Sequence, residues 1–131
     1  KGLNFMNIHA SAEDYLETIL ILCHRIVNVR SVDIANELNY TKPSVSIAMK
    51  NLRENGYILV SSEGFITLTK KGKQIADKIY ERHTILSAWL TSLGVDPKIA
   101  ANDACKIEHV ISPESFAAIK KLAASDKTEI N

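Results

Sequence analysis

The sequence predicts a mainly α-helical protein with one small β-hairpin, and three observations support this fold class. Apolar residues recur at helical spacing through most of the chain. Two short β-prone runs, 57–60 and 65–68, are joined by a connection that contains Gly64. A helix, a short helix, a turn and a third helix are predicted before this hairpin. That order is typical of an N-terminal winged helix-turn-helix, which we expect to be followed by a helical unit.

The first two helices are predicted from caps and periodicity. Ser11 is a plausible N-cap, acidic residues follow it, and apolar residues recur to about Arg25. The second helix is short and spans 31–38, with its apolar side chains on one face. Residues 39–40 then form the turn.

The third helix has the clearest boundaries. Thr41 caps it, and Pro43 lies in the first turn, where a missing amide hydrogen costs little. The pattern runs to about Glu54, and Asn55-Gly56 ends it.

Three further helices are predicted after the hairpin. The first runs over about 69–92 and is ended by Gly94, and the second spans 97–111. Ser112 caps the last helix, with a proline directly after the cap. We expect a winged-helix domain over 8–74 and a helical domain over 75–125, joined within the long helix.

Composition places the chain in the globular class. It has 131 residues, is 46% hydrophobic and carries a formal net charge of +1. No apolar run reaches about 18 residues, so we expect no membrane partner, and no signal peptide is evident. The two cysteines do not resemble a disulfide framework, which favours a cytoplasmic location. We interpret Met6 as a natural start that residues 1–5 precede.

The predicted third helix suits DNA reading, although the net charge is low for a DNA-binding protein. Lysines and arginines are concentrated in the N-terminal unit, and hydroxyls lie at the start of this helix, where they suit phosphate contacts. The alternative is that the unit serves protein contacts, because fold alone does not determine function. The candidate DNA-binding residues are Thr41, Lys42, Pro43, Ser44, Ser46, Ile47 and Lys50.

A possible metal site lies in the helix predicted over 97–111. Cys105, Glu108 and His109 stand at positions i, i+3 and i+4, which share one helix face. A thiolate, a carboxylate and an imidazole all bind divalent transition metals. Taken singly, each is more often a structural residue, and only the combination with the winged helix and with distant donors favours metal. The full candidate set is Asp14, Glu17, His83, Cys105, Glu108 and His109.

Five segments in order resemble the diphtheria toxin repressor family of metal-dependent transcription regulators, in its shorter manganese-regulator branch. These segments are 11–17, 41–46, 68–72, 81–83 and 103–112. The resemblance implies a primary site made of Asp14, Cys105, Glu108 and His109. It also implies that Glu17 and His83 hold a second ion, with Glu108 bridging the two.

This chain mixes the ligands of two branches. The manganese branch has glutamate where this chain has Cys105, whereas the iron branch has cysteine there but methionine in place of Asp14. The carboxylate favours Mn²⁺, and the thiolate favours Fe²⁺, Co²⁺ or Zn²⁺. We therefore expect Mn²⁺ or Fe²⁺ as the cofactor, with Co²⁺ or Zn²⁺ binding possible in vitro.

The predicted function is a homodimeric, metal-activated repressor of metal-uptake genes that binds double-stranded DNA at a palindromic operator. Two alternatives remain: a winged-helix regulator not controlled by metal, and a metalloenzyme, which we disfavour because no general base or nucleophile motif accompanies the cluster. Apolar residues beyond the needs of the winged unit predict the dimer interface. They are Leu86, Trp89, Leu90, Ile99, Ile107 and Val110.

Overall fold

The computed structural model describes the backbone of residues 2–130 and the side chains of residues 10–125. The expected start at Met6 lies outside the described side chains. Contacts divide the chain into two compact units, unit 1 (1–78) and unit 2 (79–131), with the division inside one long helix. Each unit is described by itself below.

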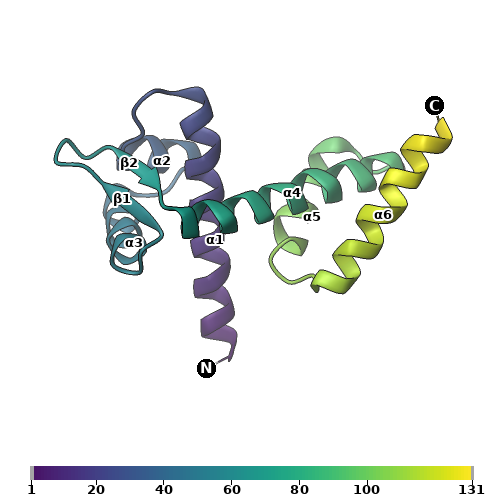
Figure 1. Cartoon of the computed structure of the whole chain (residues 1–131), viewed down its shortest axis with the longest axis horizontal. Coiled ribbons are helices and arrows are strands. Elements are labelled where there is room, and N and C mark those ends of the chain that lie inside the picture. The colour runs from purple at the N-terminus through teal and green to yellow at the C-terminus, as the bar shows by residue number, and fades with distance from the viewer. Residues whose placement is uncertain (1, 131) are drawn as a thin grey trace. The chain divides into compact units, whose positions relative to one another are not determined.

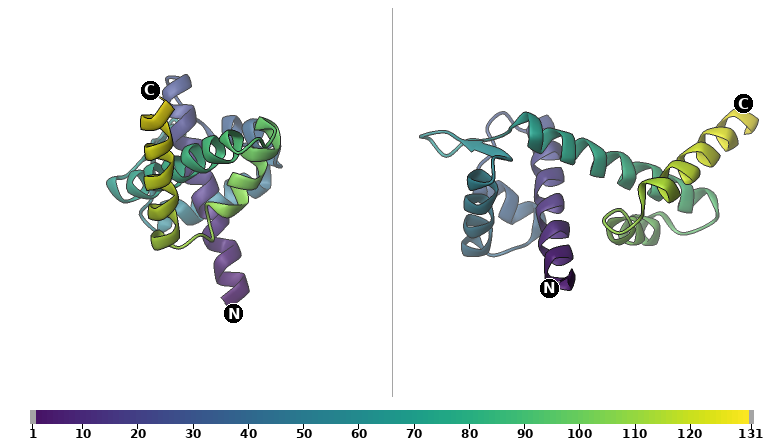
Figure 2. Two further views of the ribbon diagram at one scale, coloured as in Figure 1. Left: turned by 90° about the vertical axis from the view of Figure 1, so that its right-hand side faces the viewer. Right: turned by 60° about the horizontal axis from the view of Figure 1, so that its bottom comes forward.

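Unit 1 has the element order predicted for a winged helix. Helix α1 (Gly2–Arg25) is followed by α2 (Ser31–Leu38) and α3 (Lys42–Glu54), and then by strands β1 (Ile58–Val60) and β2 (Ile66–Leu68). Helices α2 and α3 pack against each other, and both lie on the same side of α1 (Figures 1 and 2). The first turn of α1 was predicted wrongly, because the helix begins before Ser11 and that residue is not its N-cap.

The two strands form the wing. They pair antiparallel, with Ile58 opposite Leu68 and Val60 opposite Ile66, so that each strand is one residue shorter than predicted. A further bridge joins Val29 to Ile66 and ties the wing to the segment after α1. The core of unit 1 is a continuous apolar cluster from α1, α2, α3 and the wing. Its most buried members include Leu16, Ile19, Ile34, Val45, Ile58 and Ile66.

Helix α4 (Lys70–Ser92) passes from unit 1 into unit 2. The Thr69 hydroxyl accepts a hydrogen bond from the Gly72 amide at its start. Gly72 is required there, because a side chain would overlap the carbonyl oxygen of Tyr57. Gly94 has a φ of 102° directly after the helix, which is the left-handed region that favours glycine.

Unit 2 contains the rest of α4 together with α5 (Pro97–Ile107) and α6 (Pro113–Ile130). The Ser112 hydroxyl accepts from the Ser115 amide, which confirms the predicted cap. Helix α5 ends at Ile107 rather than at residue 111, and the chain turns through residues 108–110. The apolar cluster of this unit is small and is centred on Leu86, Ala104 and Phe116.

None of the described helices is both long and apolar enough to span a membrane.

Candidate metal centre and nucleic-acid interface

The end of α5 carries three of the predicted metal ligands. Asp96 caps the start of this helix by accepting a hydrogen bond from the Lys98 amide. Glu108 is the C-cap, and its φ of −57° and ψ of −25° keep it in helical geometry. For this reason Cys105 and Glu108 retain the one-turn spacing expected of a helix although the helix itself ends earlier than predicted.

Glu108 lies between two histidines. Its Oε2 is 3.0 Å from His83 Nδ1, and its Oε1 is 3.5 Å from His109 Nε2. The Glu108 side chain is fully buried. Its Oε1 has no hydrogen bond within the described residues, because the contact with His109 is too long to count as one. A buried carboxylate oxygen without a hydrogen bond is costly, and a metal ion would satisfy it.

Cys105 joins this group through His83. Its Sγ is 3.7 Å from His83 Nδ1, and one ligand atom from each of His83, Cys105 and Glu108 lies within 4.8 Å of the others. These distances are short enough for the three side chains to hold one ion. The donor set of nitrogen, sulfur and oxygen fits a borderline divalent metal. Thus the structure brings Cys105 together with His83, which the family resemblance had placed at the second ion.

Arg82 holds the end of α5 in place, and the sequence analysis did not identify this residue. Its Nη1 donates to the carbonyl oxygens of Glu108 (3.0 Å) and Ile111 (2.9 Å), and its guanidinium lies over the Phe116 ring at 5.5 Å. The side chain is buried. It therefore satisfies carbonyl groups left open where α5 ends, and fixes Glu108 against the helix that carries His83. The only signal in the sequence was its position directly before His83.

Asp14 and Glu17 lie in unit 1, one turn apart on α1, where Asp14 is half-buried and Glu17 is buried. Their contribution to a metal centre stays a prediction. Cys23 and Cys105 do not form a disulfide.

All seven predicted DNA-binding residues are exposed on α3 or at its cap. Val45, Met49 and Leu52 face the core, so Ile47 points away from it and is 64% exposed. Thr41 caps the helix by accepting a hydrogen bond from the Ser44 amide, as predicted. The exposed face has the form of a recognition helix.

The wing is less suited to DNA than the helix. The connection between β1 and β2 contains Glu63, and its own backbone amide lowers the pKa of that carboxyl, as do hydrogen bonds from Ser61 and Ser62. The wing tip therefore carries a negative charge at neutral pH, which DNA phosphates repel. Arg30 lies against Phe65 near the wing, a cation that sequence reasoning did not single out.

The predicted dimer residues occupy different environments. Leu86 is fully buried in the core of unit 2, and Trp89 and Ile107 pack against that core. Ile99 and Val110 are 55% and 66% exposed. Leu93 and Leu122 are also exposed but were not predicted. The interface stays a prediction, and the exposed residues are those available to form it. They include Ile99, Val110, Leu93 and Leu122.

Two family models match the chain. The N-terminal DNA-binding domain of the iron-dependent repressors matches residues 7–64, and the metal-binding and dimerisation domain of the same repressors matches residues 69–128.

Among curated proteins, the transcriptional regulator MntR of Escherichia coli is 35% identical over 108 residues, which are 82% of this chain and 70% of that protein. The regulator MntR of Lysinibacillus sphaericus is 33% identical over 112 residues, which are 86% and 81% of the two chains. A solved structure of the manganese regulator SloR superposes with a TM-score of 0.76 at 27% identity, covering 85% of this chain. This chain spans about half of that structure (52%). The chain therefore belongs to the diphtheria toxin repressor family of metal-dependent transcriptional regulators.

Proposed function

We propose that this protein is a homodimeric repressor of metal-uptake genes that binds a palindromic operator when Mn²⁺ or Fe²⁺ is present. The observation that carries the proposal is the buried Glu108 carboxylate, set between two imidazoles and beside a thiol in the domain that matches the metal-binding model. Such an arrangement is costly in a purely structural role, because it buries a charge with an open oxygen.

The residues proposed to hold metal come from both units. In unit 2 they are His83, Cys105, Glu108 and His109, and in unit 1 they are Asp14 and Glu17. A bound divalent ion would supply positive charge that these donors share. Without it, carboxylates from the two units would repel one another, so the DNA-binding unit would not be held in one position. Metal would therefore favour the conformation in which the DNA-binding unit is held over the one in which it is not. How far it favours that conformation depends on the difference in metal affinity between the two.

Dimerisation would connect metal binding to DNA binding. Exposed Ile99 and Val110 offer apolar surface to a second copy. Two copies would present two α3 helices to successive major grooves about 34 Å apart, which requires an operator with matching half-sites. We propose that metal binding favours the spacing between the two α3 helices that matches the half-sites of the operator.

Fluorescence anisotropy on a labelled duplex from the region upstream of this gene tests the proposal. We expect binding to tighten about 10-fold to 100-fold between chelator and Mn²⁺ or anaerobic Fe²⁺, at fixed ionic strength. Asp14→Ala and His109→Ala should bind weakly even at high metal. Asp77→Ala is the matched control, because this exposed aspartate pairs only with Lys73 among the described residues. Equal binding with chelator and with metal would instead support a regulator not controlled by metal.

A further inference from the structure

A hollow of about 340 Å³ lies between α1 and α3 in unit 1. Ser44, Ile47 and Asn51 line it from α3 and share the exposed face of that helix, because they stand at positions i, i+3 and i+7. Ala12 and Tyr15 line it from α1. The hollow therefore opens on the side of α3 that points away from the core, within the residues that match the DNA-binding domain model.

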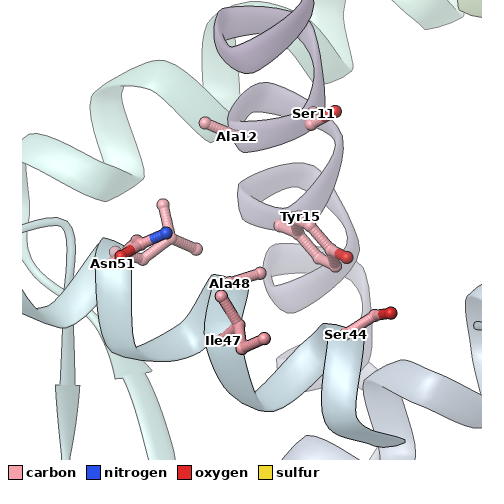
Figure 3. Close-up of a pocket in the computed structure, with 8 residues that line it drawn as sticks. Ser11, Ala12, Tyr15, Ser44, Ile47, Ala48 and Asn51 are labelled. Atoms are coloured by element: carbon pink, nitrogen blue, oxygen red, sulfur yellow. The ribbon is translucent and has the colours of Figure 1, made fainter. Parts of the chain in front are cut away.

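The lining of this hollow is mostly apolar. Figure 3 shows Ile47 and Ala48 of α3 next to Tyr15 of α1, with Ala12 one turn away along α1. Of the described residues that line the hollow, none is a lysine, arginine, histidine, aspartate or glutamate. A phosphate or a metal ion would therefore find no charge to balance its own, whereas an apolar group would find a complementary surface.

The walls of the hollow are formed without a ligand. Ile47 is 64% exposed, and a β-branched side chain has one strongly preferred rotamer in a helix, so it presents a fixed apolar surface. The Tyr15 ring is buried and meets the Tyr40 ring edge-on, with the two centroids 6.0 Å apart. Little side-chain entropy would therefore be lost when the hollow is filled.

We propose that this hollow receives the C5-methyl groups of adjacent thymines in the major groove of the operator, with Ile47 as the residue that selects for them. The inference rests on the proposed function, because it names bases that the DNA-binding unit would recognise. The thymine methyl is the apolar group that base edges present in the major groove. Ser44 and Asn51 are two turns apart, about 10 Å along the helix axis, whereas successive bases of one strand are about 3.4 Å apart. A hollow of this length has room for the methyl groups of two or more thymines in a row.

Deoxyuridine substitution tests this inference, because uracil lacks the methyl group and keeps every hydrogen-bonding group of thymine. We would measure anisotropy of the full chain with Mn²⁺ at one salt concentration. One duplex is the upstream region, and the other is a copy in which every run of two or more thymines is replaced by deoxyuridines. Loss of one buried methyl group should weaken binding about three- to fourfold, so the loss of two should weaken it about tenfold. Replacement of one run at a time should then locate the run that the hollow contacts.

Variants of the hollow should change the ratio of the affinities for the two duplexes. Ile47→Ala removes an apolar wall, and Ala48→Leu fills the space from the same helix. Both should bind the thymine duplex more weakly and bring the ratio close to one, because neither can make the methyl contact. Ile47→Leu keeps an apolar side chain of the same volume and should retain most of the ratio. An effect of deoxyuridine on the shape of the DNA would instead persist in Ile47→Ala.

Val27→Ala is the matched control. Val27 is an apolar residue of unit 1 that is 96% exposed and does not line the hollow. Its replacement should change neither the affinity nor the ratio. Unfolding midpoints of all variants show that the fold is retained.

The outcomes distinguish this inference from the proposed function. Equal binding of the two duplexes by the wild type, or a wild-type ratio in Ile47→Ala, would overturn the inference while metal-dependent binding of the thymine duplex stands. Failure of the wild type to bind the thymine duplex with Mn²⁺ or Fe²⁺ at low salt would overturn the proposed function, and the inference with it.

Discussion

Unit 1 is centred on a large apolar cluster and buries one charged residue, Glu17, whereas unit 2 buries Arg82 and Glu108 beside a much smaller apolar cluster. Burial of apolar surface stabilises unit 1 without help from a ligand. The buried polar groups of unit 2 depend on hydrogen bonds and on whatever satisfies the open oxygen of Glu108. We therefore expect the stability of unit 1 to be independent of metal and the stability of unit 2 to depend on what satisfies Glu108 Oε1.

Replacement of Arg82 by methionine should give the largest effect in unit 2. It removes two charge-assisted hydrogen bonds to the carbonyls of Glu108 and Ile111, so we expect the free energy of unfolding to fall by about 3 kcal/mol. Metal affinity should also fall about tenfold, because Glu108 loses its support. Urea unfolding with chelator and with Mn²⁺ measures both the stability and the metal affinity. The free energy of unfolding should fall more with Mn²⁺ than with chelator.

A core substitution in unit 1 provides the comparison. Ile34 is fully buried, and Ile34→Ala should lower the free energy of unfolding by about 2–5 kcal/mol, by the same amount with chelator and with metal. Lys120→Met removes an exposed cation paired with Glu81 and should cost less than about 1 kcal/mol. If the fall in the free energy of unfolding in Arg82→Met were the same with chelator and with metal, as expected for Ile34→Ala, Arg82 would have a structural role only.

Replacement of Glu108 by glutamine should separate metal binding from folding. The amide keeps the size of the side chain but removes a buried charge, so the free energy of unfolding without metal should stay within about 1 kcal/mol or rise. Metal affinity should fall at least about tenfold, because a carboxylate ligand is lost. Isothermal titration with Mn²⁺ and absorbance titration with Co²⁺ measure the affinity.

The exposed Glu114 offers a control in the same unit, and Glu114→Gln should change neither quantity. A Glu108→Gln protein that unfolds more easily without metal while still binding it tightly would contradict the contrast between the two units. In that case the carboxylate would serve the fold through its contact with His83.

Local signals were sufficient to predict most of unit 1. The bounds of the helix over 31–38, the cap at Thr41 and the hairpin follow from periodicity, a capping hydroxyl and a turn glycine, all of which act between near neighbours in sequence. The start of α1 was missed because Ser11 is a good cap that the helix does not use. Phe5, Ile8 and Ala12 continue the apolar spacing back from Tyr15, so the pattern itself allowed an earlier start.

Tertiary relations in unit 2 could not be predicted from the residues alone. Nothing near Arg82 in the sequence predicts its burial, since its partners lie 26 and 29 residues away. The grouping of Cys105 with His83 depends on how α5 packs against α4, which helical spacing does not determine. The composition of the site was therefore predictable from its residue types, but its internal pairing was not.

The substitution with the smallest expected effect tests whether the stability of unit 1 is independent of metal. Thr41→Ala removes the cap of α3 and should lower the free energy of unfolding by about 1 kcal/mol, with no dependence on metal. It also removes a hydrogen bond to Ser44, a predicted DNA-binding residue, so duplex binding should weaken about threefold without a change in its salt dependence. Thr41→Ser keeps both hydrogen bonds and should behave as the wild type. Urea unfolding and anisotropy on the same samples decide the matter: a stability loss that grew with Mn²⁺ would mean that the reading helix is coupled to the metal centre through the fold of unit 1 itself.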